Sequence, residues 1–171
     1  ADAAQLTQGY ATTVLVPLCL GEPFGGDEAS FGPWAKASAA FAETLLTTTG
    51  PGPTWLRGLP YALVPSLLRA REPGAKVGLF LDLPFPCFES FRALPRRREL
   101  LEGMLGADVL GFVARGHAEA FADACRRLLG ARVDRYGIIE HHGRRTRPLV
   151  APPGPDVLRL SSLAEHPRVV A

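Results

Sequence analysis

The sequence predicts an α/β protein with a Rossmann-like parallel sheet flanked by helices. A continuous apolar run extends from Val77 to Leu83, which is typical of a strand buried on both faces of a parallel sheet. Other short apolar segments alternate with helical repeats of roughly ten to fifteen residues, which indicates βαβ units. Such crossovers are right-handed, so the strands between them are expected to lie parallel in one sheet.

Local patterns place the individual elements. Apolar residues recur at helical spacing over 34–45, and Pro33 suits a first helical turn. The run 13–18 is also apolar, but its periodicity does not distinguish a strand from a helix. The remaining expected elements are a Gly/Pro-rich loop at 21–32, strands at 54–57, 77–83 and 107–113, helices at 63–71, 98–105 and 117–129, a helix start near Glu89, and a hairpin within 132–150.

The 171 residues are enough for one domain with a hydrophobic core. Prolines at 152, 153 and 155 interrupt the pattern, so we expect a single domain over 1–151, followed by a Pro-rich break and an extended tail over 152–171. No apolar run approaches the roughly 20 residues of a membrane span. The first residues lack the basic start and apolar core of a signal peptide, so a targeting segment is expected to be absent or already removed.

Charge and cysteine content restrict the function classes. A net charge of +2 gives no strong attraction to nucleic acid, and the arginine clusters 96–98 and 144–147 have no interleaved aromatic residues for base stacking. Cys19, Cys87 and Cys125 show no zinc-binding spacing and predict no disulfide framework. A reducing compartment, cytoplasm or organelle matrix, fits this cysteine usage, but the compartment itself stays open.

Polar residues at strand ends are the main candidates for chemistry, because ligands bind beyond the carboxyl ends of strands in open α/β sheets. Asp82 ends one predicted strand and Arg57 ends another. They could line a pocket as a phosphate-binding or acid/base pair. They could instead form an ion pair that satisfies both charges, which is the interpretation we prefer.

Four other residues receive structural interpretations. His117 is expected at the surface or as a helix cap, and Glu89 is expected to stabilise a first helical turn. Cys87 is expected to pack into a turn, although a thiolate would be favoured near a helix start. His141 and His142 are adjacent in a polar loop and are not expected to face one metal ion, so no metal site is predicted.

Several segments also follow one another in a specific order. Trp55, Tyr61 and the sequence Leu-Val-Pro at 63–65 precede the segment 78–86, Gly-Leu-Phe-Leu-Asp-Leu-Pro-Phe-Pro. The pattern continues through the segments 89–95 and 98–112, and Val-Leu-Val-Pro-Leu lies upstream at 14–18. In order and spacing, residues 8–154 resemble the amino-terminal domain of trehalose-6-phosphate synthases. These are retaining glycosyltransferases with the two-domain GT-B fold.

The resemblance implies a site for the acceptor, glucose-6-phosphate, and the chain departs from the family there. The family's strand end Trp-Val-His-Asp-Tyr-His-Leu supplies an aspartate and a histidine to the acceptor hydroxyls. The corresponding positions here include Arg57, Gly58 and Pro60. The family's histidine over the reacting sugar corresponds to Asp82, and a tryptophan corresponds to Val16. Each replacement removes a hydrogen-bond partner or a stacking surface.

The resemblance also implies parts for which we expect no counterpart. In the family, an initial strand and a glycine-bearing turn lie against the donor phosphates, upstream of a tyrosine that aligns near Thr7. The family's second Rossmann domain, which neutralises the nucleotide pyrophosphate, would follow 152–155. Without these contacts, binding could hardly supply the ~8 kcal/mol that a modest enzyme needs.

The replaced positions, Val16, Arg57, Gly58, Pro60 and Asp82, are therefore interpreted as a degenerate site without catalytic residues, and no cofactor is expected. The first hypothesis is a non-catalytic trehalose-6-phosphate-synthase-like subunit or scaffold in a larger assembly. Other protein subunits would bind an exposed sheet edge and the tail after Pro155. The alternatives are the acceptor-side half of a split glycosyltransferase and a module that senses a sugar phosphate through Arg57.

Overall fold

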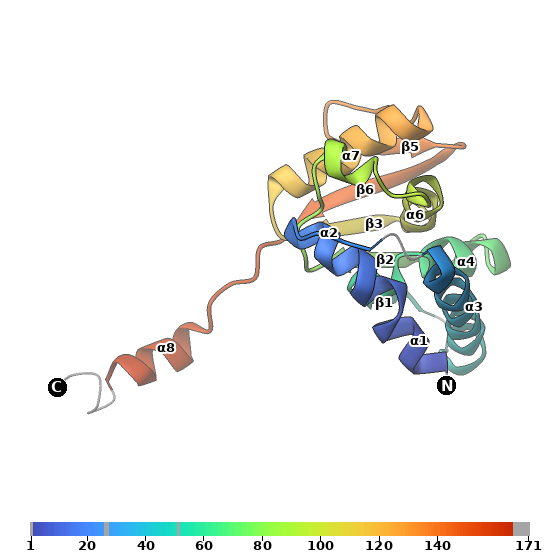
Figure 1. Ribbon diagram of the computed structural model, residues 1–171. Coiled ribbons are helices and arrows are strands. Elements are labelled where there is room, and N and C mark those ends of the chain that lie inside the picture. Colours follow the sequence, from blue (N-terminus) through green and yellow to red (C-terminus); the bar gives the residue numbers. More distant parts are fainter. Residues whose placement is uncertain (1, 26–27, 51, 166–171) are drawn as a thin grey trace.

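A computed structural model describes residues 2–25, 28–50 and 52–165 of the chain. Its centre is a six-stranded sheet with strand order β1-β2-β3-β6-β5-β4 (Figure 1). The strands are β1 (Thr54–Arg57), β2 (Val77–Leu81), β3 (Val109–Phe112), β4 (Arg132–Val133), β5 (Ile139–His141) and β6 (Arg144–Val150). The α/β class is confirmed, and the strands lie within two residues of the predicted boundaries.

The sheet is mixed. Strands β1, β2 and β3 are parallel, as the alternating pattern predicted. Strand β6 joins them, pairing parallel with β3. The hairpin expected within 132–150 adds β5 and β4, which pair antiparallel with β6 and with each other. The register aligns Arg57 with Phe80 and Leu81 with Phe112, so the parallel strands end at one common edge.

The helical segments are α1 (Asp2–Gln8), α2 (Val16–Leu20), α3 (Phe31–Thr48), α4 (Val64–Arg71), α5 (Phe88–Phe91), α6 (Arg97–Met104), α7 (Arg115–Leu129) and α8 (Val157–Ala164), with the π turn η1 (Ala11–Leu15) and the 3-10 turns η2 (Glu28–Ser30) and η3 (Leu59–Tyr61). The run 13–18, whose type the sequence left open, is helical. Within the loop predicted at 21–32, residues 26 and 27 lie outside the described residues.

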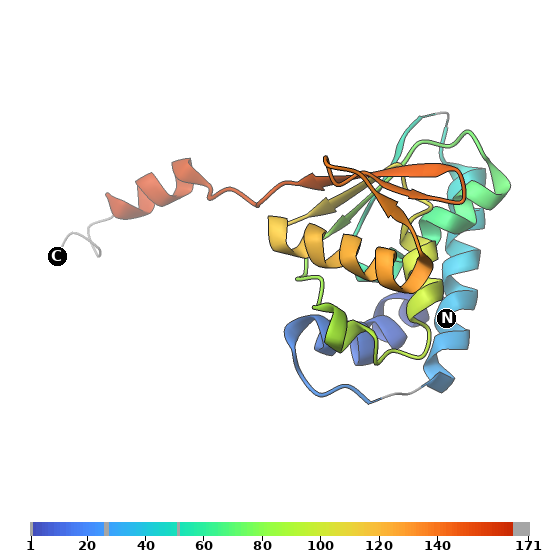
Figure 2. The ribbon, with the colours of Figure 1, turned by 90° about the horizontal axis from the view of Figure 1, so that it is seen from above.

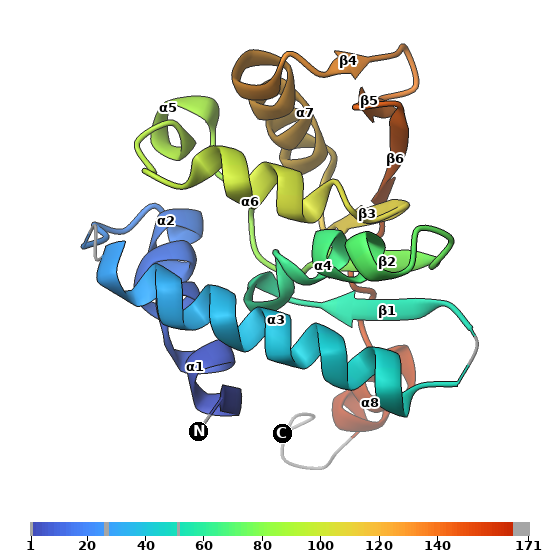
Figure 3. The same cartoon turned by 90° about the vertical axis from the view of Figure 1, so that its right-hand side faces the viewer.

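The helices gather on one side of the sheet. Figure 2 shows α3, α6 and α7 below the strands, and Figure 3 shows α3 running along β1. Leu56, Leu79 and Leu110 face this helical layer and are buried. On the other face, Trp55 is 57% exposed. The sheet is therefore covered unequally.

Aromatic rings from neighbouring strands partly cover the face away from the helices. A Cβ added at Gly78 would lie 2.2 Å from the ring of Trp55, and one added at Gly111 would lie 2.3 Å from the ring of Phe80. The expectation that the strand at 77–83 is buried on both faces is confirmed for most of β2. Helices cover one face, and the ring of Trp55 covers Gly78 on the other. Only glycine permits such close contact.

Two aromatic clusters hold the helical layer together. Tyr10 from the segment after α1 stacks on Trp34 of α3 at 5.4 Å between ring centroids. On the opposite side of the layer, Phe121 of α7 packs edge-on against Phe85 at 5.1 Å and contacts Phe112 of β3. Phe112 and Phe121 are fully buried, so this contact anchors α7 to the parallel part of the sheet.

The chain after Val150 leaves the body and forms α8, which stands apart from the sheet (Figure 1). The prediction of an extended tail is wrong for these residues, because Asp156 caps α8 by accepting a hydrogen bond from the backbone N–H of Arg159 at 3.0 Å. Residues 166–171 of the predicted tail lie outside the described residues. No helix in the described part of the chain is long and apolar enough to cross a membrane.

Candidate functional site

The structure brings Arg57 and Asp82 together at the carboxyl ends of β1 and β2. Nε of Arg57 donates to Oδ2 of Asp82 at 3.2 Å, so the predicted ion pair is present. The two side chains are 71% and 38% exposed. Water therefore screens the pair, and each charge is also partly solvated. Among the described residues, the Nη atoms of Arg57 make no hydrogen bond.

Gly58 lies beside this pair in a backbone conformation that favours glycine. Its φ is 102°, and its N–H donates to the carbonyl of Phe80 at 2.8 Å. A Cβ at this position would lie 3.8 Å from Oδ1 of Asp82 and 3.4 Å from Cδ of Pro60. A residue with a side chain would be strained here, and an aspartate would bring a second carboxylate close to Asp82.

Pro60 is part of the turn η3, which follows directly. Its carbonyl accepts a hydrogen bond from Nε1 of the buried Trp34 at 3.2 Å, so η3 is tied to α3. Val16 is half-buried at the start of α2, and the preceding turn η1 packs against η3. Arg57, Gly58, Pro60 and Asp82 thus form one local group, and Val16 belongs to the adjoining helical segment.

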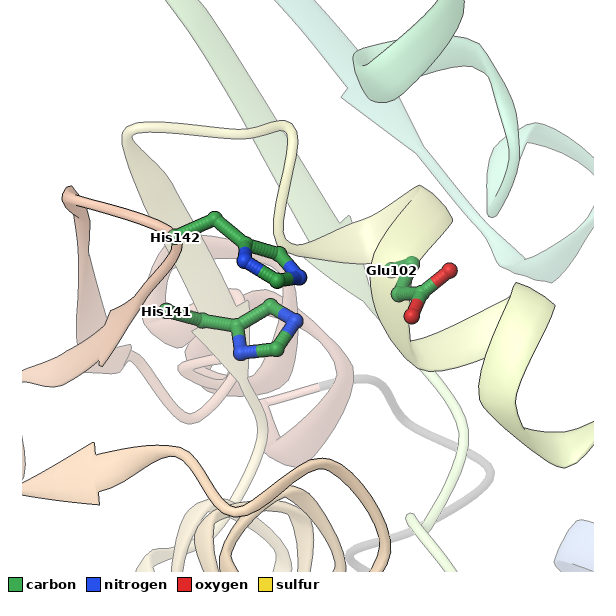
Figure 4. Close-up of side chains that lie close together, drawn as sticks. All are labelled: Glu102, His141 and His142. Carbon is green, nitrogen blue, oxygen red and sulfur yellow. The ribbon is translucent and has the colours of Figure 1, made fainter.

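The histidine pair is arranged differently from the prediction. The rings of His141 and His142 lie 3.9 Å apart between centroids, and both point toward Glu102 of α6 (Figure 4). The potential ligand atoms of the three side chains all lie within 4.8 Å of one another. The expectation that two adjacent histidines would not face one point is wrong. The positive φ of His142, 48°, turns its ring to the side that His141 faces. The sequence signal for this turn was His142 followed by Gly143.

The remaining candidates occupy separate places. His117 is half-buried in the first turn of α7, and its Nδ1 has no hydrogen-bond partner among the described residues, so it caps no backbone group through that atom. Glu89 lies in the first turn of α5, as predicted, and pairs with Arg92 at 2.6 Å.

Cys87 differs from the other two cysteines. The prediction that it packs into a turn is wrong, because its side chain is exposed at the start of α5. The hydroxyl of Ser90, 3.4 Å from its sulfur, is the main cause of a lowered pKa of the Cys87 thiol. Burial raises the pKa of Cys19 to about 12 and raises that of Cys125 as well.

Comparison with known proteins supplies the family. Residues 2–171 match the glycosyltransferase family 20 model. The trehalose-6-phosphate synthase of Mycobacterium avium is 33% identical over 177 residues, covering 96% of this chain and 36% of that protein. The trehalose synthase complex regulatory subunit of Saccharomyces cerevisiae is 34% identical over 130 residues, covering 75% of this chain and 12% of that protein.

A solved structure agrees with these relatives. The N-terminal domain of Candida albicans trehalose-6-phosphate phosphatase superposes with a TM-score of 0.83 at 30% identity, covering 94% of this chain and 35% of that one. The chain thus spans little more than a third, or less, of the proteins that it matches. The family match, the sequence similarity and the shared fold agree on one assignment: the chain belongs to glycosyltransferase family 20.

Proposed function

We propose that this chain acts as a non-catalytic subunit or scaffold in an assembly that makes trehalose-6-phosphate. The observation that carries the proposal is the arrangement at the ends of β1 and β2. An exposed Arg57–Asp82 ion pair and a glycine at φ 102° occupy the positions where, by the resemblance, the family places acceptor-binding side chains.

Glycosyl transfer must position an acceptor hydroxyl and stabilise a departing nucleoside diphosphate. At the strand ends, Gly58 offers no side chain and Pro60 offers no N–H. Asp82 is already paired with Arg57. These residues support a loss of acceptor binding more than they support catalysis.

A subunit role is supported by the edge strand β1. This strand pairs with β2 on one side only, and edge strands invite pairing with another chain. A hollow of about 480 Å³ lies between β1 and α3 and is lined in part by Phe41, Leu45 and Tyr61. A strand added at β1 could place apolar side chains there. One relative is itself described as a regulatory subunit of a trehalose synthase complex.

The test combines the purified chain with a trehalose-6-phosphate synthase. We expect no release of UDP from UDP-glucose and glucose-6-phosphate by the chain alone. We also expect co-elution with the synthase in size-exclusion chromatography with light scattering, and a change in the synthase's kcat or KM. Substituting Trp55→Glu on β1 should weaken co-elution, while Tyr136→Glu, at an exposed site in the turn before β5, should not. Turnover by the chain alone would contradict the proposal.

Sugar-phosphate sensing is a second candidate, favoured by the Nη atoms of Arg57 that the ion pair leaves unused. Calorimetric titration with glucose-6-phosphate and with trehalose-6-phosphate separates it from the scaffold role. Saturable binding that Arg57→Ala abolishes, with folding unchanged, would support sensing. Heats that are indistinguishable from buffer dilution would support the scaffold role.

A further inference from the structure

We propose that Glu102, His141 and His142 form a binding site for one divalent transition-metal ion, with Zn²⁺ as the probe. The site lies where the β5–β6 turn meets α6, away from the strand ends that carry Arg57 and Asp82. It is independent of the scaffold role proposed above. The three side chains come from two segments about forty residues apart in the sequence and converge in space (Figure 4).

The hairpin turn explains why two adjacent histidines face the same way. His141 pairs with Arg144 across the hairpin, which leaves His142 and Gly143 as the two turn residues. Both have positive φ, 48° and 73°, the signature of a type I′ turn. Successive residues of a straight strand point to opposite faces. The left-handed conformation of His142 instead brings its ring over that of His141.

The supporting elements are well anchored. Leu101 and Met104 fix α6 in the core, on either side of Glu102 in the sequence, and Ile139 fixes β5; all three are at most 2% exposed. The helix that carries Glu102 and the strand that leads into the two histidines are therefore anchored by packing. A site on anchored elements retains its geometry better than one on free loops.

His141 offers an unused ligand atom. Its Nε2 is buried and has no hydrogen-bond partner among the described residues, an arrangement that a bound cation would relieve.

The donor set selects the class of ion. Two imidazoles and one carboxylate suit zinc and related transition metals, whereas Ca²⁺ and Mg²⁺ prefer oxygen ligands. Tetrahedral bonds of about 2.0–2.1 Å place ligand atoms roughly 3.3 Å apart. The ligand atoms of the three side chains, now within 4.8 Å of one another, must therefore move closer together to bind one ion. Glu102 and His142 are exposed, so rotation of their side chains can supply the movement. Three protein ligands leave a fourth position for water or a partner's side chain.

The experiment titrates Zn²⁺ into the untagged 171-residue chain carrying Cys87→Ser, which removes the exposed thiol as a competing ligand. We expect saturable binding of one ion per chain by calorimetry and an increase in thermal midpoint that EDTA reverses. His141→Ala, His142→Ala and Glu102→Gln should each weaken binding at least tenfold. His117→Ala and Glu99→Gln, a histidine outside the cluster and a neighbouring glutamate of α6, should leave it unchanged.

Co²⁺ substitution adds a spectroscopic measurement. Visible d–d bands without thiolate charge-transfer absorption are expected for nitrogen and oxygen ligands. Zinc affinity that is equal in all five variants, or the absence of saturable binding, would overturn the proposal. Thiolate charge transfer with Co²⁺ would assign the ion to cysteine and would also overturn it.

Discussion

At the residue scale, the conformation of Gly58 shapes the end of β1. Its φ of 102° lets the backbone turn directly from β1 into η3 while its N–H reaches Phe80. A side chain would have to be accommodated against Pro60 and near the carboxylate of Asp82. The positive φ and the missing side chain at this position are therefore linked, because an aspartate placed here would be strained and would lie close to the carboxylate of Asp82.

Replacing Gly58 with alanine should lower the free energy of unfolding by about 1–3 kcal/mol, because a residue with a side chain is strained at this φ. Urea denaturation measures the effect. Gly116→Ala is the matched control, since no atom lies within 4 Å of a Cβ there and the residue is helical, so stability should stay constant or rise slightly. Equal losses for the two variants would contradict this explanation.

Cys87 should be the fast-reacting thiol of the chain. It is exposed and its pKa is lowered, so at neutral pH it carries more thiolate than an ordinary cysteine, whereas burial keeps Cys19 and Cys125 protonated. A disulfide reagent such as DTNB should show one rapid equivalent per folded chain, which Cys87→Ser removes. Three equivalents at one common rate would show that the burial argument fails.

At the scale of elements, Asp108 links three elements: α4, β2 and β6. Its Oδ2 accepts from Nη2 of Arg69 in α4 and from the N–H of Val77 in β2, both at 2.8 Å. Its Oδ1 accepts from Nη2 of Arg144 in β6 at 3.3 Å. Because Arg69 is only 11% exposed, its charge depends on this partner more than a surface arginine would.

Substituting Asp108→Ala should lower the free energy of unfolding by about 1.5–3 kcal/mol, the range for hydrogen bonds to a charged group. Asp123→Ala is the matched control, because its pairs with Arg126 and Arg127 lie on the surface of α7, and it should cost less than about 1 kcal/mol. Chemical denaturation of both variants gives the comparison. If Asp108→Ala lowered the free energy of unfolding no more than Asp123→Ala does, Asp108 would not hold these elements together as argued.

At the scale of the whole molecule, the apolar surface is unevenly distributed. The helical layer is packed, while Trp55 on β1 and Leu158 on α8 are 57% and 85% exposed. None of the described residues of α8 is buried. Exposed apolar side chains therefore lie at two places, on β1 and on α8.

Removing residues 155–171 should change the thermal midpoint by less than about 2 °C. None of the described residues of α8 is buried, so we expect the truncation to cost less than about 1 kcal/mol. Phe121→Ala, within the buried aromatic cluster, should instead cost about 3–5 kcal/mol. Circular dichroism on heating measures both. A large destabilisation by the truncation would show that α8 packs against the body in solution.

Local patterns in the sequence alone determined the α/β class, the parallel strands, the extent of the main helices and the family resemblance. These features depend on periodicity and on residues close together in the chain. They also indicated that Arg57 and Asp82 would meet, because parallel strands end at a common edge.

Only the tertiary structure decided how exposed that ion pair is, how aromatic rings cover Gly78 and Gly111, and that Glu102 approaches the two histidines. Each depends on contacts between segments far apart in sequence, or on a backbone angle such as that of His142. Periodicity reports which face of an element is apolar, but it carries no information on which side chains converge across elements. The physical cause is that packing, rather than local conformational preference, brings those groups together.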